Sequence, residues 1–80
     1  MKTVNIRFFA VFKEHAGLEM YRHETSAETL MNLYREMAGI FPGLNIEAAA
    51  LVAVNDDLAN WSQQFDDGDE VLFFPPVAGG

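Results

Sequence analysis

One amphipathic helix, set among short strand-like segments, most restricts the folds open to this chain. The helix pattern begins near residue 26, where Thr25 and Glu28 have the spacing of a capping box. Gly39 and then Pro42-Gly43 are expected to stop it. A single helix must bury its apolar stripe, and one face of a sheet is the only partner that the rest of the sequence supplies. The stripe has offsets of three and four: Ala27, Leu30, Met31, Tyr34, Met37 and Ala38.

The other segments have strand periodicity. Residues 3–10 alternate between apolar and polar, which is typical of a half-buried strand. Residues 18–24 are more polar and predict an edge strand, whereas the apolar run 51–54 predicts a buried one. Further strands are expected at 58–62 and 70–74, the last of which is ended by Pro75-Pro76.

The connections complete the order β-β-α-β-β-β. Residues 10–16 resemble a short helical turn ended by Gly17, and 44–50 fit either a loop or one helical turn. Turns are expected at Asn55-Asp56-Asp57 and at Asp66-Asp67-Gly68-Asp69. We therefore expect an α+β fold, in which a mixed sheet has its first and last strands adjacent at the centre and the helix crosses one face.

Charge and cysteine content exclude several classes of protein. The 80 residues contain 5 Lys plus Arg against 12 Asp plus Glu, a formal charge of −7, which is the wrong sign for binding nucleic acid or an anionic membrane. The absence of Cys excludes disulfides, thiolate catalysis and cysteine-ligated metals. No apolar run approaches the roughly 20 residues of a membrane span, and the N-terminus lacks a signal-peptide pattern. We expect a soluble cytoplasmic protein.

No set of side chains predicts catalysis or metal binding. His15 and His23 are isolated in the sequence and are interpreted as ordinary polar residues. The run 66–70 is superficially similar to a calcium loop but lacks its 12-residue spacing and terminal bidentate Glu. We interpret it, like Asp56-Asp57, as an acidic turn.

The C-terminus is the remaining candidate for chemistry. Gly79-Gly80 ends the chain in a carboxylate, which becomes an acyl donor only when its oxygen is replaced by a good leaving group, as in an acyl-adenylate. A tail without Cβ atoms can thread a narrow channel, and Pro75-Pro76 would hold it away from the sheet. We predict a domain over 1–76 and a flexible tail over 77–80; the alternative is a frayed end without function.

Strand alternation also predicts an apolar patch at the root of this tail. If Val4, Ile6, Phe8, Val71 and Phe73 face the helix, then Phe9, Leu72 and Phe74 point away from it. Exposed aromatic clusters commonly mark binding surfaces. The alternative is that residues 44–50 fold over the patch.

The ending Asp67-Gly68-Asp69-Glu70-Val71 … Phe73-Phe74-Pro75-Pro76-Val77-Ala78-Gly79-Gly80 resembles that of the ThiS/MoaD family, specifically the MoaD-type sulfur carriers that form the small subunit of molybdopterin synthase. The segments 7–10 and 52–55 fit this family as well, whereas residues 18–50 fit by pattern more than by identity. The resemblance implies the β-grasp, ubiquitin-like fold.

The resemblance also implies a role in molybdenum cofactor biosynthesis. The Gly80 carboxylate would be adenylated by an E1-like adenylyltransferase with MgATP, and a sulfur donor protein would convert it to a thiocarboxylate. The tail that carries the thiocarboxylate would enter the large subunit of molybdopterin synthase and give sulfur to cyclic pyranopterin monophosphate, forming the dithiolene of molybdopterin. The family assembles as a heterotetramer. The carrier itself would bind no cofactor and would not be catalytic.

By position, the family implies a role for each residue near the tail. Gly80 would bear the sulfur, and Gly79, which has no side chain, would leave room for the tail to enter a narrow site. Phe9, Leu58 and Phe74 match docking positions, and the inserted arm would be formed by Pro75, Pro76, Val77 and Ala78. Three alternatives stay open at this point: a carrier for thiamin thiazole, a ubiquitin-like protein modifier, and a binding module with an inert tail.

Overall fold

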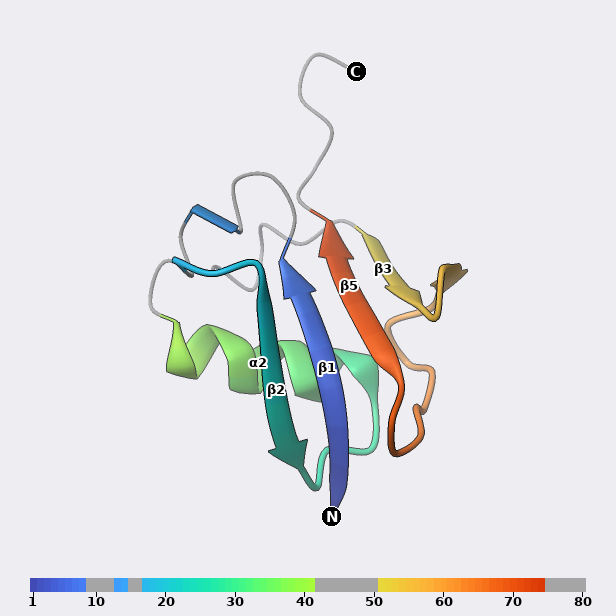
Figure 1. Ribbon diagram of the computed structural model, residues 1–80. Helices are drawn as coiled ribbons and strands as arrows, with labels where there is room; N and C mark the ends of the chain where they lie inside the picture. Colours follow the sequence, from blue (N-terminus) through green and yellow to red (C-terminus); the bar gives the residue numbers. More distant parts are fainter. Residues whose placement is uncertain (9–12, 15–16, 42–50, 75–80) are drawn as a thin grey trace.

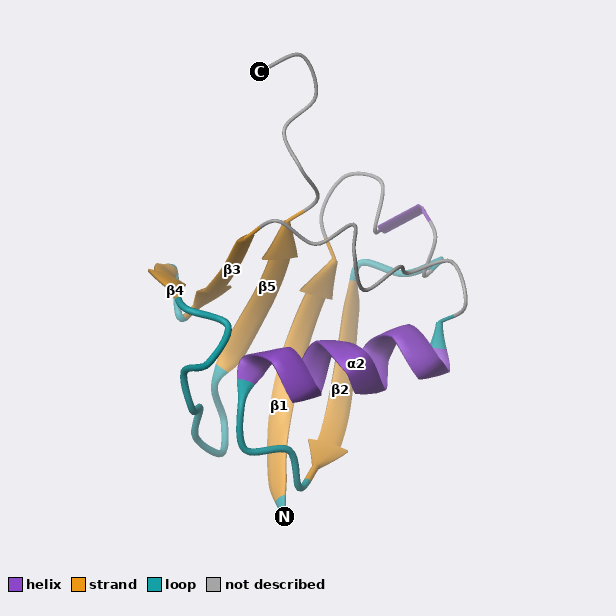
Figure 2. Ribbon diagram, turned by 180° about the vertical axis from the view of Figure 1, so that it is seen from behind, coloured by secondary structure: helices purple, strands orange, loops and turns teal. Residues whose placement is uncertain are grey.

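A five-stranded sheet with one helix across one of its faces forms the body of the protein (Figures 1 and 2). The computed structural model describes residues 1–8, 13–14, 17–41 and 51–74. The mixed sheet and its single long helix confirm the predicted α+β, β-grasp class. The elements are β1 (Lys2–Phe8), β2 (Met20–Thr25), α2 (Leu30–Ile40), β3 (Leu51–Val54), β4 (Asp57–Ala59) and β5 (Glu70–Phe74).

The sheet has the order β2-β1-β5-β3-β4, so the first and last strands are neighbours, as predicted. β1 and β5 run parallel, and every other neighbouring pair is antiparallel. The polar strand β2 lies at one edge, also as predicted, and β4 lies at the other. β1 buries Val4, Ile6 and Phe8 against the helix, which its alternating pattern requires.

The start of the helix differs from the prediction. α2 begins at Leu30, and its N-cap is Thr29, whose side chain accepts a hydrogen bond of 3.3 Å from the Asn32 N–H. The Thr25–Glu28 capping box does not form, because the Thr25 hydroxyl accepts from the Ala27 N–H at 2.9 Å and donates to Glu36. Thr25 therefore closes the end of β2 and does not start the helix.

The far end and the apolar stripe of α2 also differ in detail. The helix passes through Gly39 to Ile40, and the Phe41 N–H closes it on the Met37 carbonyl at 2.8 Å. Met31, expected in the stripe, is only half-buried. Its place is taken by Leu33, which the predicted stripe omitted. The buried residues of the helix are Leu30, Leu33, Tyr34 and Met37.

β4 is shorter than predicted, because the residues after it bind the start of α2. The Leu30 N–H donates to the Gln63 carbonyl at 3.0 Å, and the Met31 N–H donates to the Trp61 carbonyl at 2.9 Å. Two of the unpaired N–H groups of the first helical turn are satisfied in this way. The segment 60–63 therefore supplies hydrogen-bond acceptors to the helix, and the strand ends at Ala59.

The core lies between the sheet and α2. At its centre the Tyr34 ring packs edge-on against Phe73, with centroids 4.8 Å apart, and against Trp61 at 5.7 Å. Tyr34 is fully buried, and desolvation raises its pKa from 10.0 to about 12. The buried cluster is formed by Val4, Ile6, Phe8, Ala27, Leu30, Leu33, Tyr34, Met37, Val52, Val54, Phe65, Val71 and Phe73.

The predicted turns are present where the structure describes them. Asn55 and Asp56 have φ of 50° and 72°, so they form the left-handed pair that suits a tight β3–β4 hairpin. Gly68 turns at φ 87° before β5. Gly17 has φ 77°, and its N–H bonds the Lys13 carbonyl at 3.0 Å, as expected for the end of a helical turn. Residues 44–50 lie outside the described residues.

Candidate functional site

The face of the sheet opposite α2 carries a continuous line of mainly apolar side chains. Figure 1 looks onto this face, with the helix behind the sheet. Directly paired residues point to the same side of a sheet, so the strand register identifies the side chains that lie in one row. That row crosses all five strands in the order Met20, Arg7, Leu72, Ala53 and Leu58. Phe74 and Leu51 pair in the next row, at the end of β5.

Most of these apolar side chains are accessible to a partner, whereas Ala53 is only 5% exposed. Leu58 is 70% exposed, Met20 48% and Leu51 44%, while Leu72 and Phe74 are half-buried. Isolated exposed apolar residues are ordinary, but a contiguous group of them marks an interaction surface. We call this group the outer apolar strip: Met20, Leu51, Ala53, Leu58, Leu72 and Phe74.

The strip occupies only the half of the face near the end of β5. The next row towards the opposite end is polar, because Asn5 pairs with Arg22 on one side and with Glu70 on the other. Beyond it, Thr3 pairs with Glu24. The apolar half therefore borders Phe74, the last described residue before the C-terminal segment 75–80.

The sequence-predicted docking residues fall into two groups. Leu58 and Phe74 belong to the strip, in neighbouring rows on strands β4 and β5. The other predicted site residues lie outside the described residues, as does the segment 44–50, so the roles assigned to them stay predictions. These residues are Phe9, Pro75, Pro76, Val77, Ala78, Gly79 and Gly80.

Arg7, Met20 and Leu51 were not among the predicted docking residues. Arg7 lies within the strip's main row, where its Nη1 is 3.3 Å from the Glu70 Oε1. Alternation along residues 3–10 already placed Arg7 on the face of Phe9, so a signal for it existed. For Met20 the signal was that an apolar residue stands in a strand that was predicted to be polar and at an edge of the sheet. Leu51 was predicted inside a buried run, yet it lies on the exposed face.

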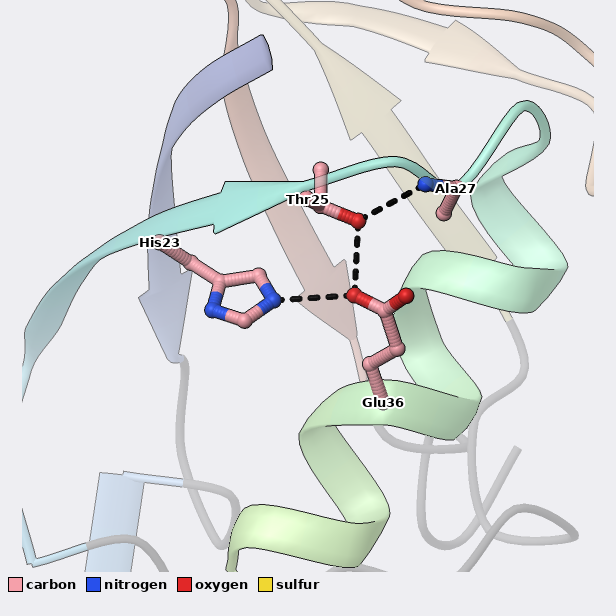
Figure 3. A network of polar contacts seen from close by, with 4 residues as sticks. All are labelled: His23, Thr25, Ala27 and Glu36. Atoms are coloured by element: carbon pink, nitrogen blue, oxygen red, sulfur yellow. Dashed lines mark hydrogen bonds and ion pairs between the residues drawn. The ribbon is translucent and has the colours of Figure 1, made fainter. Parts of the chain in front are cut away.

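The isolated His and Asp residues have structural roles where the structure describes them. His23 Nε2 lies 2.9 Å from Glu36 Oε1, which also accepts from the Thr25 hydroxyl at 2.6 Å, so edge strand β2 is tied to α2 (Figure 3). Asp69 accepts from the Asp66 N–H at 2.8 Å and from the Asn55 amide at 2.9 Å. The acidic run 66–70 therefore forms a turn that is closed by a hydrogen bond within the run, and it is an acidic turn, as predicted.

Neither a metal-binding cluster nor a membrane-spanning helix is found within residues 1–8, 13–14, 17–41 and 51–74. In these ranges, no three His, Asp or Glu side chains gather closely enough to hold a metal ion. The helices of the same ranges include none with the length and apolar character needed to cross a membrane.

Known proteins match this chain over nearly its full length. The model of the ThiS family matches residues 6–80, so the chain belongs to the ThiS family. It is 35% identical to the molybdopterin synthase sulfur carrier subunit of Escherichia coli, over 96% of this chain and 99% of that protein. The family expected from the C-terminal motif is thereby confirmed.

Two solved structures share the fold. SAMP1 from Haloferax volcanii superposes with a TM-score of 0.82 at 25% identity, covering 98% of this chain and 99% of that chain. A chain of the complex of subunits 1 and 2 of the molybdopterin-converting factor from Helicobacter pylori matches with a TM-score of 0.65 at 30% identity, over 98% of this chain and 99% of the matched chain. The β-grasp topology is thus common to these proteins and the present one.

Proposed function

We propose that this protein is the sulfur carrier subunit of a molybdopterin synthase and acts through the carboxylate of Gly80. The observation that carries the proposal is the likeness to a sulfur carrier subunit over the full length of both chains. The position of the outer apolar strip supports it, because the strip borders the strand from which the tail continues. The carrier is a co-substrate, and its partners supply the catalytic groups.

The chemistry follows from the terminal carboxylate. A carboxylate oxygen attacks the α-phosphorus of MgATP, pyrophosphate leaves, and the acyl-adenylate forms on an E1-like enzyme. The outer sulfur of a persulfide on a donor protein then displaces AMP and forms an acyl disulfide. A thiol of the partner proteins cleaves its S–S bond, which leaves a disulfide on the partners and releases the thiocarboxylate on Gly80. This group supplies nucleophilic sulfur in a chain that has no cysteine. After transfer to the pterin precursor, the released carboxylate can be charged again.

The outer apolar strip is the surface that would hold the carrier on the large subunit. Leu58 and Phe74 are its proposed anchors, and Phe9 is a further proposed docking residue. The arm 75–78 and Gly79 would enter the partner's site, where a glycine gives the least obstruction. Support for such a partner comes from the matched Helicobacter pylori structure, which is a complex of two subunits.

Intact mass spectrometry tests the proposal directly. The protein is incubated with an activating enzyme of proven competence, MgATP and a sulfur donor. Its mass should rise by about 16 Da, because sulfur replaces one oxygen of the terminal carboxyl group. A variant lacking Gly80 is the control and should not gain this mass. An unchanged mass for the full chain would contradict the carrier role.

A second candidate function is protein modification, which the likeness to SAMP1, a small archaeal modifier protein, favours. The same activated glycine would then form an isopeptide bond with a lysine of another protein. Recovery from cells of lysine peptides that carry the C-terminal residues of this chain would support it. Activity in a reconstituted molybdopterin synthase assay would separate the main proposal from both modification and thiamin-thiazole synthesis.

A further inference from the structure

A hollow of about 220 Å³ opens beside the outer apolar strip at the end of β1, with the start of β2 on one side and β5 on the other. It is lined by Arg7, Phe8, Glu19 and Leu72. Arg7 and Leu72 are register partners on β1 and β5, and the Phe8 N–H donates to the Glu19 carbonyl at 2.9 Å. Because main-chain pairing connects its walls, the hollow is formed before any partner arrives.

The charges of the lining select a neutral occupant. Arg7 is on one side, with its Nη1 3.3 Å from Glu70, and Glu19 is on another, 3.9 Å from the Lys13 ammonium. A carboxylate placed between them would meet the like charges of Glu19 and Glu70. An ammonium group would meet Arg7. Either ion would also lose solvation on a surface that a partner covers.

Among neutral groups, the lining favours an aromatic ring with a hydrogen-bond donor. A guanidinium stacks on the face of an aromatic ring, and the attraction grows when the pair is shielded from water. The Glu19 carboxylate can accept from an indole N–H or a phenol O–H. A cavity of about 150 Å³ already holds benzene in a protein, so the volume here is sufficient for a ring.

We propose that this hollow receives a tryptophan or tyrosine side chain of the protein that covers the outer apolar strip. Leu72 belongs to both the strip and the hollow, so one partner can occupy the two together. The identity of that partner as the large synthase subunit rests on the proposed function. Tryptophan and tyrosine are also, with arginine, the side chains enriched among the anchors of protein interfaces.

The binding preference can be tested on the protein alone. The isotope-labelled full chain is titrated with N-acetyl-tryptophanamide and, separately, with N-acetyl-leucinamide, and amide shifts are followed by NMR. Saturable shifts should centre on Arg7, Phe8, Glu19 and Leu72, with affinity for the aromatic probe at least about threefold higher. Equal binding of both probes, or shifts that do not saturate, would overturn the proposal.

Two conservative variants separate stacking from charge. Arg7→Lys keeps the charge but removes the planar guanidinium, and it should lower the affinity for the aromatic probe by about threefold or more. Arg22→Lys, on the same face but outside the hollow, is the matched control and should bind like the wild type. Both variants are checked for an unchanged melting temperature. If Arg7→Lys binds the probe as well as the wild type does, the stacking role is wrong.

A third measurement brings in the partner. Arg7→Lys should lower affinity for the large subunit by about fivefold or more, whereas Arg22→Lys should not. This result is separate from the carrier chemistry, because a protein that fails to gain sulfur at Gly80 can still bind the aromatic probe. Conversely, a hollow that binds no probe would leave the gain of sulfur at Gly80 unaffected. An equal effect of the two variants on affinity would overturn the partner assignment.

Discussion

Single residues on the outer face are expected to contribute very different amounts of binding energy to the proposed interface. Phe74 is half-buried on the strand that leads into the tail, while Leu58 is mostly exposed at the edge strand. Side chains near the centre of an interface, where water is excluded, carry most of the binding energy. Phe74 is therefore expected to be the stronger anchor of the two.

Phe74→Ala should weaken binding to the large synthase subunit by about 2 kcal/mol or more, because it removes an aromatic anchor. Isothermal titration calorimetry measures the affinity, and thermal unfolding measures the stability in parallel. Ile40→Ala is the matched control, since Ile40 is an exposed apolar residue at the end of α2 and lies off the strip. Unchanged affinity together with a lower melting temperature would make Phe74 a core residue instead.

Tyr34 gives the core a dependence on pH. Burial raises the pKa of Tyr34 to about 12, so in the folded protein the phenol keeps its proton at a pH where the unfolded chain has lost it. This contribution to the free energy of unfolding is complete below pH 10 and is lost as pH rises from 10 towards 12. The loss should reach about 2 kcal/mol.

Chemical denaturation between pH 9 and 12 tests this expectation for Tyr34. The variant Tyr34→Phe has no phenol to ionise, so its stability should fall less over the same interval, whatever its stability at neutral pH. The measured quantity is the difference between the two pH profiles. Parallel profiles would contradict a role for Tyr34 in the alkaline loss.

At the scale of elements, periodicity predicted the strands and the order of the chain, but it misplaced the start of the helix. Thr25 and Thr29 both precede an acidic or polar residue at a spacing of three, so local pattern does not choose between them. The choice depends on Glu36, eleven residues further along, which binds the Thr25 hydroxyl. The early end of β4 has a similar cause, because helical N–H groups distant in sequence bind residues 61 and 63.

Thr25→Val should lower the free energy of unfolding by about 1–2 kcal/mol, because it removes the hydroxyl that joins Glu36 to the Ala27 N–H (Figure 3). The same change at Thr3, a half-buried position on the outer face of β1, is the matched control and should cost less. Urea unfolding measures both variants. Equal losses would show that the Thr25 bonds contribute nothing specific to stability.

For the whole molecule, the sequence predicted the topology more completely than the site. The apolar half of the outer face follows from alternation in β1 and β5, so the amino-acid pattern alone was enough to place Leu72 and Phe74 there. Alternation also places Arg7 on this face, but that Arg7, Met20 and Leu51 lie next to Leu72 and Phe74 follows only from the register of the strands, which no local pattern contains. The proposed sulfur-bearing role of Gly80 rests on the family, because a terminal glycine has no side chain that could reveal its chemistry.

The net charge of −7 is also a property of the whole molecule, and we expect it to affect the rate of association with a partner. If the large subunit surrounds its pocket with basic side chains, long-range attraction accelerates association, and salt screens it. Stopped-flow mixing should therefore show the association rate falling by about tenfold as ionic strength rises from low to physiological values. The dissociation rate should change far less, because the outer apolar strip is proposed to hold the complex by contacts that salt does not screen.

The double variant Asp56→Asn and Asp57→Asn removes two exposed charges at the β3–β4 turn, beside Leu58, and should reduce this salt dependence. Glu28→Gln, which removes an exposed charge just before α2, is the control and should have a smaller effect. An association rate that ignores salt would show that the acidic surface plays no part in docking. A change confined to dissociation would assign the two aspartates to direct contacts instead of long-range attraction.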